Sequence, residues 1–144
     1  MSRGPARTAG AVTDARPSPE AQMPQISVDY SANLADAFDR RALGLALNQL
    51  AVKFLTVAPD GCKTRFRRAD ETVVVGERAE GQDLVLVDFQ IFPGRTPEAK
   101  AGLTEAVLAL LAEHLPAAPG RRLHTAVKVV DMDSDSYRGT TLDG

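Results

Sequence analysis

A strand–helix–strand pattern occurs twice in succession, and it constrains the fold of this chain more than any other feature. The strands that open the two halves begin at Pro24 and Leu84, 60 residues apart. Each half then contains one helical pattern and one further extended stretch. Two tandem βαβ units predict an α/β (α+β) fold: a mixed four-stranded sheet with both helices on one face. The other sheet face has no cover within one subunit, which predicts an oligomer.

The first half is predicted from its apolar periodicity. Its opening strand alternates polar residues with Ile26, Val28 and Tyr30. A helix capped by Asn33 or Asp36 is expected to run to about Leu55, with an apolar stripe made of Leu43, Leu47, Leu50 and Phe54. The second extended stretch covers residues 63–75, and the polar run 76–83 closes this half.

The second half repeats the plan more clearly. Residues 84–92 carry apolar side chains on both faces, which predicts a strand that is buried on both sides. Thr96 is a suitable N-cap for the following helix, and Pro97 suits its first position. The alternating residues 123–129 form the last predicted strand.

The composition divides the chain into three parts. Residues 1–22 contain no Leu, Ile, Phe or Tyr, which predicts a disordered N-terminal extension or a mis-assigned translation start. Residues 23–132 form the predicted domain. The remaining segment, 133–144, is a C-terminal tail in which Tyr137 and Arg138 are candidates for contact with a neighbouring subunit.

Charge and composition exclude several classes of protein. A net charge of −2 argues against a partner nucleic acid, which usually requires a basic surface. No apolar run approaches the roughly 20 residues that span a bilayer. One cysteine cannot form an internal disulfide, so nothing indicates an oxidising compartment. We therefore expect a soluble cytoplasmic protein.

The metal-binding motifs are incomplete. Asp131, Asp133 and Asp135 have the spacing that opens a calcium loop, but Ser136 and Leu142 stand where glycine and glutamate are needed. One cysteine and two separated histidines do not predict a zinc site. The expectation is a protein that holds no metal.

Pro24 is the first candidate for a chemical role. A methionine before a small residue, proline included, is commonly removed, and Met23 precedes Pro24. Its removal leaves a free secondary amine, whose basicity is shifted towards neutrality by burial and nearby positive charge. The structural alternative is that Pro24 occupies the first position of a strand, where a residue without an N–H is tolerated.

Three basic residues are candidates for binding an acid. Arg95 precedes the N-terminus of the second helix, where its charge is unfavourable unless a carboxylate ligand or solvent relieves it. Lys63 and Arg65 share one face of an extended stretch with Arg67. Such a charged edge serves either to bind acids or to prevent aggregation between sheet edges.

Three short segments, in this order and spacing, resemble the 5-carboxymethyl-2-hydroxymuconate isomerase family of the tautomerase superfamily. The segments are residues 23–33 (MPQISVDYSAN), 61–65 (GCKTR) and 94–96 (GRT). The resemblance extends over about residues 23–132.

The resemblance implies an isomerase without a cofactor. In that family an amino-terminal proline moves a proton between a dienol oxygen and a carbon, basic side chains hold the substrate's carboxylates, and the subunits form a trimer. Carried over, these roles imply that Pro24 is the general acid/base and that Arg95 binds a carboxylate of a small-molecule substrate in a homotrimer. The family's first arginine position falls on Lys63, with Arg65 two residues on; a lysine keeps the charge but loses the bidentate fork.

One departure leaves alternatives open. In the chain as written, the nitrogen of Pro24 belongs to a peptide bond, and its delocalised lone pair cannot act as a base. Either Pro24 becomes the free N-terminus, or the protein is a non-catalytic trimeric anion-binding protein of the same fold. A second enzymatic alternative keeps Pro24 as the base but acts on another enol or α,β-unsaturated acid, or performs a hydration.

Overall fold

The structure, a computed structural model, describes residues 23–69 and 73–144. The predicted extension, residues 1–22, lies outside the described residues. The four strands and two helices are β1 (Gln25–Ser31), α1 (Arg40–Leu55), β2 (Lys63–Ala69), β3 (Gln82–Ile91), α2 (Pro97–His114) and β4 (Arg122–Asp131), with short 3-10 turns at η2 (Ala32–Leu34) and η3 (Pro59–Gly61).

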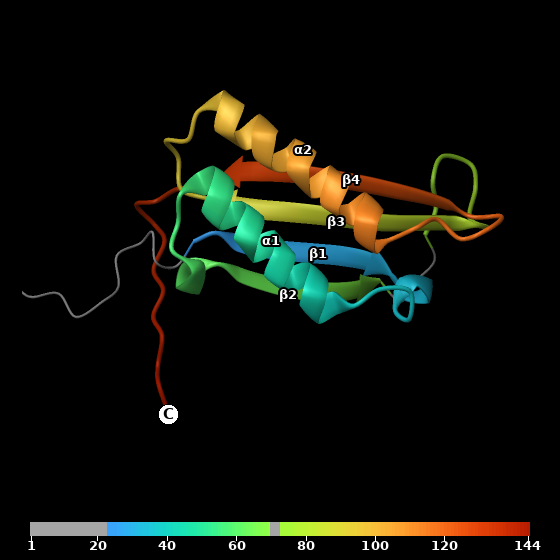
Figure 1. The fold of residues 1–144 in the computed structure, drawn as a ribbon, viewed down its shortest axis with the longest axis horizontal. Coiled ribbons are helices and arrows are strands. Elements are labelled where there is room, and N and C mark those ends of the chain that lie inside the picture. The colour runs from blue at the N-terminus through green and yellow to red at the C-terminus, as the bar shows by residue number, and fades with distance from the viewer. Residues whose placement is uncertain (1–22, 70–72) are drawn as a thin grey trace, which may run out of the picture.

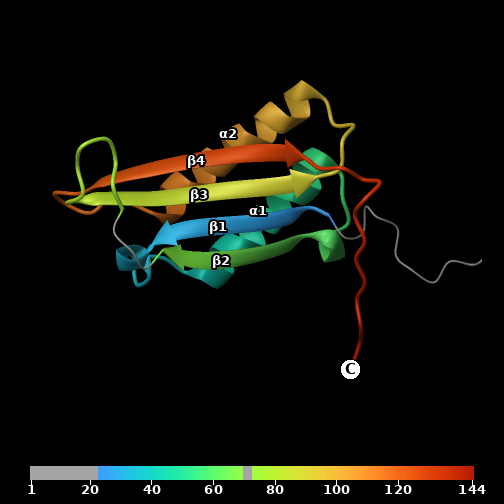
Figure 2. The ribbon, with the colours of Figure 1, turned by 180° about the vertical axis from the view of Figure 1, so that it is seen from behind.

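The strands form one mixed sheet in the order β2-β1-β3-β4. Within each half the two strands are parallel, β1 with β2 and β3 with β4, while β1 and β3 are antiparallel. Both helices cover one face of this sheet (Figure 1), and the opposite face is open in the single chain (Figure 2). The predicted fold is confirmed.

The core lies between the sheet and the two helices. The strand residues that face the helices are fully buried, as the alternation predicts: Ile26, Val28, Val85, Val87 and Phe89. The helices contribute buried residues at helical spacing: Leu43, Leu47, Ala51, Leu103, Val107 and Leu111. On the open face Leu86 is 39% exposed, so within one chain the prediction of a strand buried on both sides is wrong.

The first helix begins later than predicted. Its N-cap is Asp39, whose carboxylate accepts a hydrogen bond from the backbone N–H of Ala42 at 3.0 Å, so Asn33 and Asp36 are not the cap. The side chain of Asn33 hydrogen-bonds that of Asp83 on β3 instead. Asn33 thus forms a hydrogen bond with a residue on a distant strand instead of capping α1.

β3 begins earlier than predicted, at Gln82 instead of Leu84. The predicted polar run 76–83 includes two residues of β3, and Asp83 is only 2% exposed. Its carboxylate accepts two hydrogen bonds from Arg121, both at 2.9 Å, and these bonds lower the pKa of Asp83. This ion pair joins the beginning of β3 to the turn before β4.

The second extended stretch is shorter than predicted. β2 ends at Ala69, whereas the prediction continues to Val75. Val75 instead forms an isolated bridge with Arg78, in which each backbone N–H donates to the other residue's carbonyl. Of the remaining predicted residues, 70–72 lie outside the described residues, and Val73 and Val74 belong to no strand.

Candidate active site

The directions of the strands bring four separate segments to one edge of the sheet, the edge formed by the ends of the strands. The parallel strands β1 and β2 begin there, just after Pro24 and at Lys63. Because β3 is antiparallel to β1, it ends at the same edge, directly before Phe92. β4 is parallel to β3 and also ends there, and the C-terminal tail leaves from it and runs past the edge (Figure 2).

Pro24 lies in a small cavity at this edge. The residues around it are Met23, Leu55, Val57, Ile91, Phe92 and Arg95. All of these are apolar except Arg95, so Pro24 shares a largely dry space with one cation. The cavity volume is about 10 Å³, which is room for about one water molecule.

Arg95 is held by the end of the other helix. Its Nε and Nη2 groups donate to the carbonyl oxygen of Leu55, at 3.2 and 2.8 Å. Leu55 is the last residue of α1, where carbonyl groups lack helical partners and the helix dipole is negative. This carbonyl, rather than a ligand or solvent alone, offsets the unfavourable position of Arg95 before α2. A guanidinium has five N–H donors, so these two bonds leave others for an anion.

Lys63 and Arg65 lie on β2, and neither lines the cavity of Pro24. The backbone N–H of Lys63 donates to the carbonyl of Pro24 at 3.2 Å, so the two residues are neighbours across the strands. Both basic side chains are exposed, and the strand alternation directs them to the open face of the sheet. The described chain therefore brings Pro24 and Arg95 together in one cavity. Lys63 and Arg65 lie outside this cavity, on the open face of the sheet.

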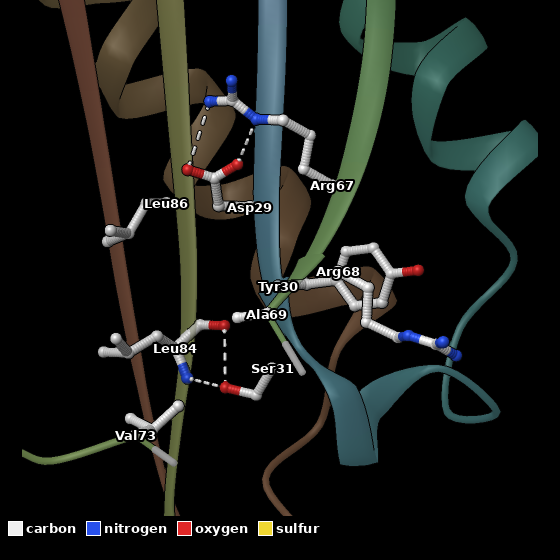
Figure 3. A pocket seen from close by; sticks show the side chains of 9 residues that line it. All are labelled: Asp29, Tyr30, Ser31, Arg67, Arg68, Ala69, Val73, Leu84 and Leu86. Atoms are coloured by element: carbon white, nitrogen blue, oxygen red, sulfur yellow. Dashed lines mark hydrogen bonds and ion pairs between the residues drawn. The ribbon is translucent and has the colours of Figure 1, made fainter. Parts of the chain in front are cut away.

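Arg67, further along β2, belongs to a different hollow on the open face (Figure 3). Its guanidinium donates to both carboxylate oxygens of Asp29, at 2.7 and 3.3 Å, and these bonds raise the pKa of Arg67. The hollow, of about 240 Å³, lies at the far end of β1 from Pro24, and Leu84 and Leu86 also line it. The charge of Arg67 is therefore offset by Asp29 within this hollow.

Neither a thiolate nor a metal is suggested by the described residues. Cys62 is buried, its thiol donates weakly to the carbonyl of Ala58, and burial raises the pKa of that thiol. It therefore remains a protonated packing residue at neutral pH. Within residues 23–69 and 73–144, no group of three or more His, Cys, Asp or Glu side chains could hold a metal ion.

Tyr137 lies next to the cavity of Pro24, a position that the sequence did not indicate. Its ring packs edge-on against Phe92, with centroids 5.5 Å apart and an interplanar angle of 78°. Its hydroxyl accepts a hydrogen bond from Nε2 of Gln25 at 3.2 Å. The tail residue expected to reach a neighbouring subunit thus contacts its own chain beside Pro24. The sequence singled it out only for contact with a neighbouring subunit, and no spacing in the sequence links it to Phe92.

Comparison with known families gives one match that covers most of the chain. The sequence model of 5-carboxymethyl-2-hydroxymuconate isomerase matches residues 24–140. No curated protein sequence matches the chain. Within the described part of the chain, neither helix has the length and apolar character needed to cross a membrane.

Solved structures share the fold. A 5-carboxymethyl-2-hydroxymuconate isomerase from Deinococcus radiodurans R1 has a TM-score of 0.72 at 22% identity, over 84% of this chain and 92% of that one. A 5-carboxymethyl-2-hydroxymuconate delta-isomerase has a TM-score of 0.67 at 16% identity, over 84% and 89% of the two chains. A fused 4-OT, a wild-type symmetric trimer, has a TM-score of 0.61 at 21% identity, over 75% and 85%. At these identities the likeness establishes the architecture.

Proposed function

The chain belongs to the 5-carboxymethyl-2-hydroxymuconate isomerase family, within the tautomerase superfamily, and from this premise we propose that it isomerises 5-carboxymethyl-2-hydroxymuconate or a similar unsaturated 2-hydroxy dicarboxylic acid. The carboxymethyl group adds one further carboxylate to the two of a muconate. The observation that carries the proposal is the cavity shared by Pro24 and Arg95, a potential base and a cation from distant parts of the chain.

The proposed reaction is a proton transfer without a cofactor. As a free amine, Pro24 takes the proton of the dienol hydroxyl and returns a proton to a carbon of the conjugated chain, which leaves the 2-oxo isomer. Arg95 binds a carboxylate and stabilises the negative charge that develops on the dienolate. The apolar walls and the cation both favour the neutral amine, which is the form that accepts a proton.

The mechanism requires that Pro24 is the first residue of the working protein. We propose that the protein made from its own gene begins at Pro24, and its intact mass tests this directly. A mass that corresponds to a chain starting at Pro24, together with isomerase activity, is the expected result. The mass of all 144 residues without isomerase activity would favour the alternative function, a non-catalytic trimeric protein that binds anions.

We propose a homotrimer in which the open face of the sheet meets neighbouring subunits. Around Pro24 the described chain supplies one cation, Arg95, whereas an acid with several carboxylates needs more than one. The open face carries Leu86, which is 39% exposed, and also Lys63 and Arg65. A subunit packed on this face would bury the leucine and bring cations to a shared site.

Replacing Leu86 by arginine should dissociate this oligomer. An arginine fits the surface of one chain, next to Asp29 on β1, but it places a charge in the apolar contact. Sedimentation velocity should give three times the chain mass for the unmodified protein and one chain mass for Leu86→Arg. The matched control is Leu45→Arg on the outer face of α1, where Leu45 is 52% exposed and the trimer should persist. An unmodified protein that is monomeric and active would contradict the proposal.

Replacing Arg95 by alanine should lower kcat/KM more than tenfold, which is a loss of about 1.4 kcal/mol of transition-state binding. The reason is the loss of the cation beside Pro24. Steady-state kinetics with the dicarboxylic substrate measure this fall in kcat/KM. The control is Arg122→Ala, at the opposite ends of the strands. Thermal unfolding of both variants separates this effect from the loss of the bonds to Leu55. Unchanged kinetics would remove Arg95 from the site.

A further inference from the structure

The C-terminal tail returns to the candidate site through one side chain. Tyr137 contacts Gln25, the residue after Pro24, and Phe92, which lines the cavity of Pro24. It is partly buried, whereas its sequence neighbours Ser136 and Arg138 are exposed. The tail is therefore attached to the domain at the mouth of this cavity.

A local turn presents Tyr137 to the domain. The carboxylate of Asp133 accepts from the backbone N–H of Asp135 at 3.1 Å. Nη1 of Arg138 then donates to the carbonyl of Asp135 at 3.0 Å and to that of Tyr137 at 2.8 Å. These bonds fold the tail into a local turn around Tyr137. The ring of Tyr137 leaves this turn and packs against Phe92.

The contacts of Tyr137 leave its hydroxyl proton available. In the bond with Gln25 the amide N–H is the donor and the phenol oxygen is the acceptor. A tyrosine hydroxyl both accepts and donates, so the O–H of Tyr137 remains free to donate to an oxygen of a bound molecule. A donor of this kind forms its strongest hydrogen bonds with ionised groups such as carboxylates.

The position of Tyr137 indicates which oxygen its hydroxyl would reach. Met23 lines the cavity and is absent from a protein that begins at Pro24, so the reacting end of the substrate would lie beside Pro24 and the rest would extend over the rim of the cavity. On the described chain that rim includes Phe92 and Tyr137, an apolar surface with one polar group. Arg95 lines the cavity beside Pro24, so it is placed to hold the carboxylate nearer to Pro24.

We infer that Tyr137 is a substrate-binding residue that selects acids with a second carboxylate: its hydroxyl donates a hydrogen bond to a carboxylate farther from Pro24, and its ring forms a wall with Phe92. This inference rests on the proposed isomerase function for its substrate class. It makes the C-terminal tail part of the binding site, in addition to any contact with a neighbouring subunit.

Tyr137→Phe tests the hydroxyl alone, because phenylalanine keeps the ring contact with Phe92. For the dicarboxylic substrate we expect KM to rise about tenfold and kcat to change less than twofold. For a monocarboxylic 2-hydroxydienoate that lacks the far carboxylate, kcat/KM should stay the same. The control is Tyr30→Phe, which removes a phenol hydroxyl at the far end of β1. Unchanged KM for the dicarboxylic acid, or an equal loss on both substrates, would overturn the inference.

A binding experiment separates failure of this inference from failure of the proposed reaction. Adipate is an inert dicarboxylate, and calorimetric titration with adipate needs no proton transfer by Pro24. We expect Tyr137→Phe to bind adipate about tenfold more weakly than the unmodified protein. If no isomerisation is detected but this difference is found, the proposed reaction fails and Tyr137 keeps its role. Equal affinities for adipate would overturn the role of Tyr137 whether or not the protein is an isomerase.

Discussion

A polypeptide that begins at Pro24 is expected to isomerise its dicarboxylic substrate about a thousandfold faster than the 144-residue chain. Within a chain the nitrogen of Pro24 is part of a planar amide, and its lone pair is delocalised into the carbonyl group. As the first residue the same nitrogen is a secondary amine that binds and releases a proton. General acid–base catalysis typically accelerates a reaction by about 10²–10⁴-fold, so the whole of this factor depends on the terminus.

The comparison needs two preparations of verified mass. One starts at Pro24 and the other retains residues 1–23, and both are assayed by the ultraviolet absorbance of the dienol. Circular dichroism and sedimentation should show the same fold and assembly for both, so that a difference in rate reports the amine. The rate of the shorter protein should rise with pH through the pKa of the amine, since only the neutral form accepts a proton. A 144-residue chain that matches its rate would rule out Pro24 as the base.

The second large effect concerns stability. Replacing Phe89 by alanine should lower the free energy of unfolding by about 3–5 kcal/mol. Phe89 is fully buried on the central strand β3, paired across the sheet with Ile26 on β1 and Val129 on β4. Truncation removes a whole ring from the layer between sheet and helices, and the rigid sheet cannot close the space. Since domains of this size are stable by about 5–15 kcal/mol, this is a large share of the total.

Urea unfolding measures the loss, and Leu108→Ala is the control. Leu108 on α2 is 42% exposed, so its truncation should cost less than about 1 kcal/mol. All variants must be compared at the same protomer concentration, because association stabilises the folded subunit by mass action. A loss below about 1 kcal/mol for Phe89→Ala would show that the core is not packed as described.

The elements were predictable where local chemistry decides them. Thr96 accepts from the backbone N–H of Ala99 at 3.1 Å, and Pro97 opens α2, as the sequence predicts. The predicted end of β2 and the predicted start of α1 were wrong. In the second case Asn33 hydrogen-bonds Asp83, 50 residues away, and Asp39 becomes the cap. A short polar side chain chooses between a local and a distant partner, and periodicity carries no information about that choice.

The candidate site was predictable only in part. Pro24, Arg95, Lys63 and Arg65 were recognisable as unusual residues or by resemblance, and as site residues they remain predictions. The carbonyl of Leu55 that holds Arg95, and the contact of Tyr137 with Phe92, have no counterpart in the sequence pattern. Each joins residues that are brought together only when the helices and the tail pack.

The sequence by itself determined the two βαβ units, the buried face of β1 and the start of α2, because each follows from the spacing of apolar residues and from caps within a few positions. The tertiary structure decided that Pro24 and Arg95 line one cavity and that Tyr137 packs against Phe92 beside it. This arrangement depends on β1 and β3 running in opposite directions, so that one begins where the other ends. Strand direction is set by packing of the whole sheet, and neighbouring residues along the chain do not encode it.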